Sequence, residues 1–155
     1  MKKGQAAMEF LMTYGWAILV VIAAIAALAY FGVLDPARLL PERCQFPAGM
    51  DCIDKAAITT TGITFALKNN NGFPVTVSSA TTTACQGTAT FAVGASNTTF
   101  TSSAVVPNNE VLKVNIACSL NKGNKFDAND VTVTYTNTES GLTNNAVGSI
   151  RGKVA

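Results

Sequence analysis

A long stretch without charged residues, close to the start of the chain, limits the folds that the chain can adopt. Between Glu9 and Asp35 the sequence contains no Asp, Glu, Lys or Arg, and Ala, Leu, Ile and Val predominate. The apolar run from Phe10 to Leu34 is about 25 residues long, whereas an α-helix needs roughly 20 residues to span a bilayer. The sequence therefore predicts a long apolar helix over residues 5–34, able to cross a membrane.

The rest of the composition argues against several classes of function. The chain has 155 residues, a formal net charge of +2 and 13% charged residues. Its basic residues are scattered, so no nucleic-acid-binding surface is expected. Histidine is absent from the sequence, and with it the commonest general base and a frequent metal ligand. We therefore expect no enzyme activity, no cofactor and no metal site.

The cysteines indicate an oxidising environment for the part of the chain that follows the apolar run. Cys44, Cys52, Cys85 and Cys118 contain no C-x2-C pair of the kind that binds zinc, so disulfides are expected. Three pairings are open. We favour Cys44 with Cys52, which bracket a loop containing Pro and Gly, and Cys85 with Cys118, which lie in predicted strands. Asn97 begins an N-x-T glycosylation acceptor, and it too indicates an extracytoplasmic domain.

The residues after the second cysteine change in character. They are rich in Thr, Val, Asn and Gly, and they alternate apolar with polar side chains, which is the period of a half-buried strand. The segments that fit best are 63–67, 75–77, 91–93, 112–118, 131–135 and 150–154. Turn signals separate them, so about six to eight strands are expected in an antiparallel β-sandwich of the Ig-like type. The predicted fold class is α+β, with a hydrophobic helix followed by a β-sandwich head over residues 55–155.

Three further predictions concern the connections. Residues 35–54 are expected to form a neck that carries the first disulfide, with a helical turn over residues 37–40. The stretch Asn69 to Gly72 is predicted to be the tip of a hairpin, because Asn-Gly favours tight turns. Residues 127–130 are interpreted as a solvated turn, since the further carboxylates and the glycine of a calcium-binding loop are missing there.

Glu9 is not explained by the simplest interpretations of the helix. A single-pass anchor with Lys2 and Lys3 on the cytoplasmic side accounts for the hydropathy, and a cleaved secretion signal fits less well because the apolar run is too long. A carboxylate in a membrane helix costs free energy unless it has a partner or a role. If the chain is cut after Gly4, the new amino group of Gln5 can approach Glu9 of a neighbouring helix and neutralise both charges. We therefore expect Glu9 to act in assembly.

The opening of the chain resembles a known family. Lys2-Lys3-Gly4 followed by Gln5-Ala6-Ala7-Met8-Glu9-Phe10 is similar to the class III, prepilin-type signal of archaeal type IV pilins. Weaker similarity extends to residues 12–17 and 148–154, and the specific part covers about the first thirty residues. Ala7 stands where the family commonly has serine, which is a mild departure. Archaellins, the related subunits of rotary filaments, mature and assemble in the same way, but the opening Gln5 to Phe10 favours an adhesive pilus.

The resemblance implies a path of maturation and assembly. A membrane prepilin peptidase would cut between Gly4 and Gln5, removing residues 1–4 as a leader and leaving the helix on the mature subunit. The precursor would wait in the cell membrane. An assembly ATPase and a membrane platform would then build the subunits into an extracellular helical filament, so the expected partner of the chain is further copies of itself.

The aromatic residues of the helix would then lie in the filament core. Phe10 belongs to the motif and is expected to pack there. Tyr14 and Trp16 are expected either to anchor the helix at the membrane interface or to act as packing wedges in the bundle, and these two roles stay open. Two functions of different class remain: a filament-forming pilin subunit, and a single-pass membrane-anchored extracellular β domain that acts as a binding module.

Overall fold

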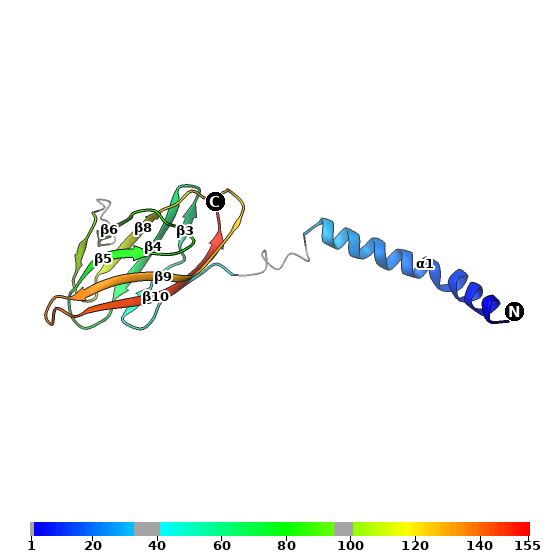
Figure 1. Ribbon diagram of the computed structural model, residues 1–155, viewed down its shortest axis with the longest axis horizontal. Helices are drawn as coiled ribbons and strands as arrows, with labels where there is room; N and C mark the ends of the chain where they lie inside the picture. Colours follow the sequence, from blue (N-terminus) through cyan, green and yellow to red (C-terminus); the bar gives the residue numbers. More distant parts are fainter. Residues whose placement is uncertain (1, 33–40, 95–100) are drawn as a thin grey trace. The chain divides into compact units, whose positions relative to one another are not determined.

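A computed structural model of the chain describes residues 2–32, 41–94 and 101–155. The chain divides into two compact units, Met1–Leu40 and Pro41–Ala155 (Figure 1). The first unit contains a long helix, and the second contains antiparallel β-sheets. The predicted fold class, a long apolar helix followed by a β-sandwich, is confirmed.

Helix α1 covers Lys2–Tyr30. Ala, Leu and Met favour the helix, and no proline interrupts it. It ends because Gly32 adopts a left-handed conformation, with φ of 67°, and the Gly32 N–H donates to the carbonyl oxygen of Ala29 at 3.1 Å. Such a glycine is a frequent helix C-cap. The helix begins before the predicted start at residue 5, so residues 2–4 are not set apart in the fold.

The described residues of the second unit form ten strands. Their bounds are β1 Arg43–Gln45, β2 Met50–Cys52, β3 Ala57–Thr59, β4 Gly62–Asn69, β5 Val75–Thr81, β6 Ala89–Val93, β7 Ala104–Val106, β8 Val111–Ala117, β9 Lys125–Asn137 and β10 Thr143–Lys153. The segments expected from alternation lie in β4, β5, β6, β8, β9 and β10, and two of them extend one residue beyond the end of the strand. The strands that were not expected, β1, β2, β3 and β7, have three residues each, which is too short for a period of two to be recognised.

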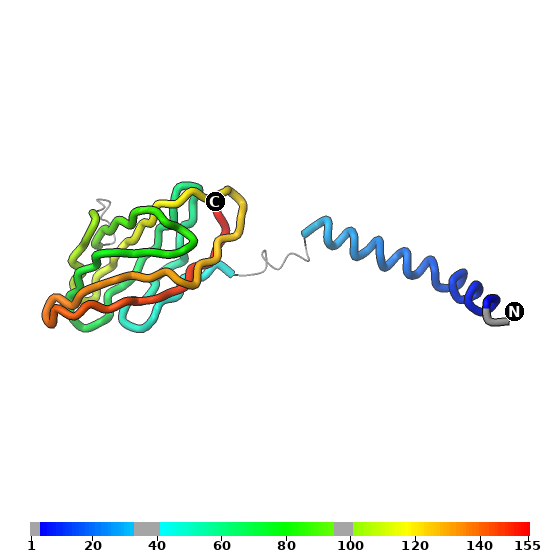
Figure 2. Tube along the Cα trace, in the orientation of Figure 1, coloured from blue at the N-terminus to red at the C-terminus, as the bar shows by residue number. Residues whose placement is uncertain are grey.

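The strands pair antiparallel in two sheets. The first sheet has the order β1-β10-β9-β5-β7, and the second has the order β2-β4-β8-β6 with β3 also beside β4. The long β9–β10 hairpin, orange to red in Figure 2, runs through the first sheet. The stretch 127–130, expected as a solvated turn, instead belongs to β9. Its Ala128 is buried, and Asp127 pairs with Arg151 at 2.9 Å and with Lys125 at 3.3 Å.

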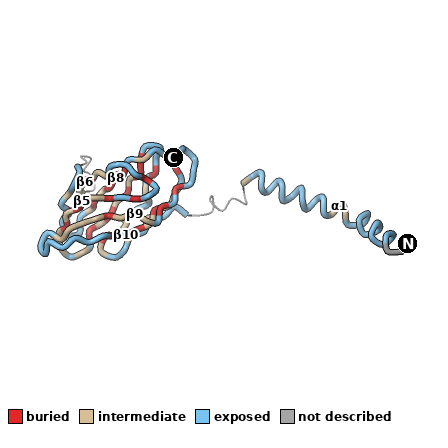
Figure 3. Tube along the Cα trace, viewed as in Figure 1, coloured by how far each residue is buried: buried red, intermediate tan, exposed pale blue. Residues whose placement is uncertain are grey.

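The core consists of the inward-facing side chains of both sheets, and the buried residues of the strands are red in Figure 3. Its fully buried members include Ile63, Leu67, Val75, Val77, Leu112, Val114, Ile116, Val131, Val133 and Ile150. Burying each such side chain is worth about 1.5–3 kcal/mol. The alternation seen in the sequence is thus the pattern of contact with this core.

Residues 41–54 do not form a separate neck, and that boundary differs from the prediction. Strand β1 pairs with β10 in the first sheet, and β2 pairs with β4 in the second, so this segment is part of the β domain. The pairing of β1 with β10 is close: a Cβ on Gly148 would lie 2.6 Å from the Gln45 carbonyl oxygen. The sequence does not reveal this pairing because it joins segments about a hundred residues apart. Residues 37–40, the predicted helical turn, lie outside the described residues.

The Asn69–Gly72 segment is not the tip of a hairpin, because β4 and β5 belong to different sheets. Asn69 itself is fully buried. Its Nδ2 donates to the carbonyl oxygens of Phe73 at 2.9 Å, Val106 at 3.1 Å and Pro107 at 3.2 Å. Its Oδ1 accepts from the Asn71 backbone and side chain. One side chain therefore joins the connection that follows β4 to the connection that follows β7.

Replacing Asn69 by Ala is expected to destabilise the β domain by about 3 kcal/mol, because it removes the bonds to three carbonyl oxygens, including that of buried Val106, and leaves a cavity at a fully buried position. The matched control is Asn70→Ala. Asn70 is exposed and bonds to the Asp51 carboxylate at 2.7 Å, so its loss should cost about 0.5 kcal/mol or less. Denaturant unfolding of the full chain in detergent measures both values. Equal effects of the two variants would contradict the role given to Asn69.

Candidate functional site

The apolar surface of α1 is the candidate functional site. The segment Gly4–Tyr30 is long and apolar enough to cross a membrane, and none of its length is buried within the described structure. Large apolar side chains are exposed on all sides of it, for example Met12 at 82% and Leu19 at 68%. In water this surface would cost about 25 cal/mol for each Å² of apolar area. The helix therefore needs lipid or other protein around it.

Glu9 lies on α1 and is exposed. The Thr13 Oγ1 donates to its backbone carbonyl oxygen at 2.8 Å, which is a local bond within the helix and does not involve the carboxylate. Among the side chains that the structure describes, no cation pairs with the Glu9 carboxylate. A partner for it in an apolar environment has to come from outside this part of the chain.

The residues of the predicted cleavage site, Gly4 and Gln5, lie in α1 and are exposed. A Cβ on Gly4 would meet nothing within 4 Å. Packing within the chain therefore does not require glycine at this position, and glycine in a helix costs about 1 kcal/mol relative to alanine. The same holds for Gly15, which also has open space where a Cβ would lie.

The aromatic residues named from the sequence are all exposed on α1. Phe10 is 60% exposed, Tyr14 53% and Trp16 69%. The rings of Phe10 and Tyr14 lie against each other with centroids 4.8 Å apart, so they form one surface one turn apart on the helix. Trp16 points from a different side of the helix, since residues two apart do not share a face.

Small residues make part of this helix thin. The alanines of its second half are Ala17, Ala23, Ala24, Ala26, Ala27 and Ala29. Ala23 and Ala27 are four residues apart and so lie on one face. Small residues at this spacing let two helices approach closely in an apolar medium, where packing contacts replace contacts with lipid. Thus α1 combines a thin segment with a bulky aromatic one.

The two disulfides join different segments of the β domain, and the first of them connects a strand of one sheet with a strand of the other. Cys44 on β1 is bonded to Cys52 on β2, and Cys85, which follows β5, is bonded to Cys118, which follows β8. This is the pairing that the sequence analysis favours. No cysteine of the chain is free. Two disulfides indicate an extracytoplasmic location, and the apolar helix indicates a membrane anchor or a signal.

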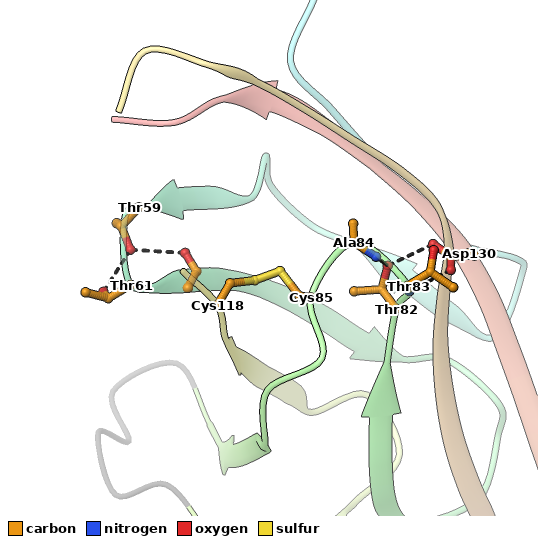
Figure 4. The surroundings of a disulfide bond; sticks show 9 residues. Thr59, Thr61, Thr82, Thr83, Ala84, Cys85, Cys118 and Asp130 are labelled. Atoms are coloured by element: carbon orange, nitrogen blue, oxygen red, sulfur yellow. Dashed lines mark hydrogen bonds between the residues drawn. A yellow bond between two sulfur atoms is a disulfide. The ribbon is translucent and has the colours of Figure 1, made fainter. Parts of the chain in front are cut away.

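An open hollow of about 400 Å³ lies beside the Cys85–Cys118 disulfide, lined by Thr61, Gln86, Gly87 and Ser119 among others. Figure 4 shows the surroundings of this disulfide, where Asp130 of β9 faces the turn at Thr82 and Thr83. The Thr82 Oγ1 donates to the Asp130 Oδ1 at 2.8 Å, and the Thr83 N–H donates to Oδ2 at 2.7 Å. These bonds hold the turn before Cys85 against β9.

Asp130 and Asn69 lie in stretches that the sequence indicates as turns, and their hydrogen-bonding roles were not expected. For Asn69 a signal was available, because it continues the alternation of Phe65 and Leu67 on the buried face. Asp130 gave no signal, since its partners are almost fifty residues away. The glycosylation candidate Asn97 lies outside the described residues. No metal-binding group of three or more His, Cys, Asp or Glu occurs in the part of the chain that the structure describes.

Comparison with known proteins gives no identity: no protein-family model and no curated protein sequence matches this chain.

Hydrogen bonds from Thr83 and then from Thr82 hold the pKa of the Asp130 carboxyl below its usual value. Such a group stabilises the fold above its unfolded pKa of about 4, and this contribution is lost as the pH falls through the folded pKa. Asp130→Asn should therefore cost about 1 kcal/mol at pH 7, after allowing for solvent screening, and much less in acid. Urea unfolding of the full chain at several pH values tests this. The exposed Glu139→Gln is the control, and a cost for Asp130→Asn that does not change with pH would contradict it.

Proposed function

We propose that the chain is a structural subunit of an extracellular filament of the type IV pilin kind, polymerising through α1. The observation that carries the proposal is the apolar surface of α1, which is unburied along the whole described helix. A helix with this surface is stable in lipid or among helices of its own kind, but not in water. A subunit that leaves the membrane must therefore bury it against other copies at the same time.

Two residues near the start of α1, Gly4 and Glu9, support assembly over a plain anchor. An anchor needs neither a glycine at position 4 nor a carboxylate at position 9, and no contact among the side chains that the structure describes explains either of them. In a filament they have roles: Gly4 marks the point of cleavage, and Glu9 pairs with the new amino group at Gln5 of a neighbouring subunit. The pair would neutralise two charges in a medium of low dielectric constant.

The β domain suits the outside of such a filament. Contacts between identical subunits that do not close into a ring produce an open helix, with the helices inside and the β domains facing water. The outward positions of its strands are polar: on β9 half-buried Thr132 and Thr134 alternate with buried Val131 and Val133. The two disulfides suit an oxidising exterior.

A single-pass anchored binding module remains the second candidate. It is supported by the length of α1, which is sufficient to span a bilayer without any partner. In that case the chain keeps its N-terminus, and the β domain acts as a single unit outside the membrane.

Maturation separates the two candidates. N-terminal sequencing of the surface form is expected to begin at Gln5 for the filament subunit, and at residue 1 for the anchor. Gly4→Leu should retain residues 1–4 without disturbing the helix, because a side chain at this position has open space. Ala7→Ser, which introduces the residue common in the resembled family, is the control and should be processed normally. Processing of Gly4→Leu at the wild-type rate would exclude a glycine-specific peptidase.

Assembly is tested by Glu9→Ala and Glu9→Gln. Both variants are expected to insert into the membrane but to form at most about one tenth of the wild-type number of filaments. The reason is that an unpaired amine in the core costs about 3 kcal/mol or more. Electron microscopy of sheared surface material counts the filaments, and membrane fractionation measures insertion. Glu139→Ala, in the exposed β9–β10 turn, is the matched control. Wild-type numbers of filaments from both Glu9 variants would remove the role of this carboxylate.

A further inference from the structure

We infer that the Cys44–Cys52 disulfide is a mechanical clamp, which transmits tension from α1 into the second sheet and keeps residues 45–51 from unravelling. The inference rests on the proposed function in one respect: a filament subunit, like an anchored module, is held through α1 while its β domain contacts the outside. Tension in a single chain is measured without a filament, so the two proposals can fail separately.

Tension on α1 reaches the β domain at its first residue. The second unit begins at Pro41, and the first strand after it is β1. Between them Glu42 forms a salt bridge with Lys55 at 3.0 Å. Both side chains are largely exposed, where solvent screens the attraction. The first substantial resistance to a pull therefore has to come from β1.

Strand β1 by itself is a weak attachment. It is the edge strand of the first sheet and pairs with β10 through three residue pairs, Arg43 with Arg151, Cys44 with Ile150 and Gln45 with Ser149. Backbone hydrogen bonds of this kind contribute about 0.5–1.5 kcal/mol each. Held only by this ladder, β1 would separate under load, and the residues after it would follow.

The disulfide gives the tension a second route. Cys44 is the middle residue of β1, and Cys52 is the last residue of β2 in the other sheet. Strand β2 pairs with β4 at Met50, Asp51 and Cys52. Strand β4 in turn pairs with β8 along seven residue pairs from Gly62 to Lys68. The covalent bond thus connects the strand that is pulled to β2, which is itself an edge strand, and through the pairing of β2 to the interior strand β4.

The segment between the two cysteines would be costly to unravel. Phe46 stacks on Phe65 of β4, with ring centroids 5.5 Å apart, and Met50 is 1% exposed. Withdrawing residues 45–51 would remove both side chains from the core and open the edge that the two sheets share. The clamp therefore protects the core at the point where the load enters the domain.

The second disulfide serves as an internal comparison. Cys85 and Cys118 are separated by 33 positions, against 8 for Cys44 and Cys52. Its cysteines lie after β5 and after β8, far along the chain from Pro41. The Cys85–Cys118 disulfide shortens the length of chain that is released when the whole domain unfolds. It is not bonded to β1, the strand on which the tension acts first. Removing it should not create an early step.

The test is force spectroscopy on full-length single chains, with α1 held in a detergent micelle. One handle is attached to a peptide tag just before Pro41, and the other to a tag in the β9–β10 turn at residues 138–142. Cys44→Ser/Cys52→Ser is expected to add an early extension of about 20 Å before the main unfolding event. This is the extended length of eight residues, about 28 Å, minus the Cα–Cα distance of 5.9 Å.

The matched control is Cys85→Ser/Cys118→Ser, which should show no early extension but a main event longer by about 110 Å. A main event of wild-type length in the first variant reports that its domain is folded. If that variant fails to fold, the variant Cys44→Ala/Cys52→Val, which has apolar side chains at both positions, takes its place in the experiment. The same early extension in the wild type, or its absence from the folded Cys44/Cys52 variants, would overturn the clamp. Neither result changes the count of filaments by electron microscopy.

Discussion

The hydrophobic surface of α1 sets the condition that the other parts of the molecule have to meet. A helix satisfies its own backbone hydrogen bonds, so it can exist in lipid or in a bundle, but its apolar side chains cannot stay in water at a cost of about 25 cal/mol per Å². None of the described helix is covered by the rest of the chain. Its cover must therefore be lipid or other protein. The same condition applies to Glu9, because a carboxylate without a partner costs free energy where water is absent.

The β domain is built for the opposite environment. Its apolar side chains face inward between two sheets, and polar side chains alternate with them along strands such as β9. Short edge strands limit unwanted pairing with other chains. The Cys44–Cys52 disulfide joins the two sheets covalently, and the Cys85–Cys118 disulfide joins the connections that follow β5 and β8. Buried Asn69 performs the same task with hydrogen bonds at the connections that follow β4 and β7. The domain is thus held together at its edges and connections as well as through its core, which suits a unit that is loaded through its first strand.

Local patterns predicted much of this structure and failed where contacts are distant in sequence. The uninterrupted apolar run gave α1, and alternation gave the strands around Phe65, Val114 and Val133, because each of these signals is complete within a few residues. Strand β1 was missed since three residues carry no periodicity and their partner is β10. The Asn69–Gly72 stretch was interpreted from its turn residues alone, although alternation placed Asn69 on the buried face. Glu9 and the aromatic residues of the candidate site were named from the sequence, while in the β domain the bonds of Asp130 with Thr82 and Thr83 were not.

The amino-acid sequence by itself determined that the chain has an apolar helix long enough for a membrane, a β domain with cysteines for two disulfides, and a carboxylate near the start of the helix. These properties depend on composition and on short periods, which are present in the chain before it folds. Tertiary structure alone decided that residues 43–52 belong to two different sheets and that Cys44–Cys52 bridges them at the place where the helix segment is attached. That arrangement depends on long-range strand pairing, whose entropy cost and register are settled only when the whole core assembles.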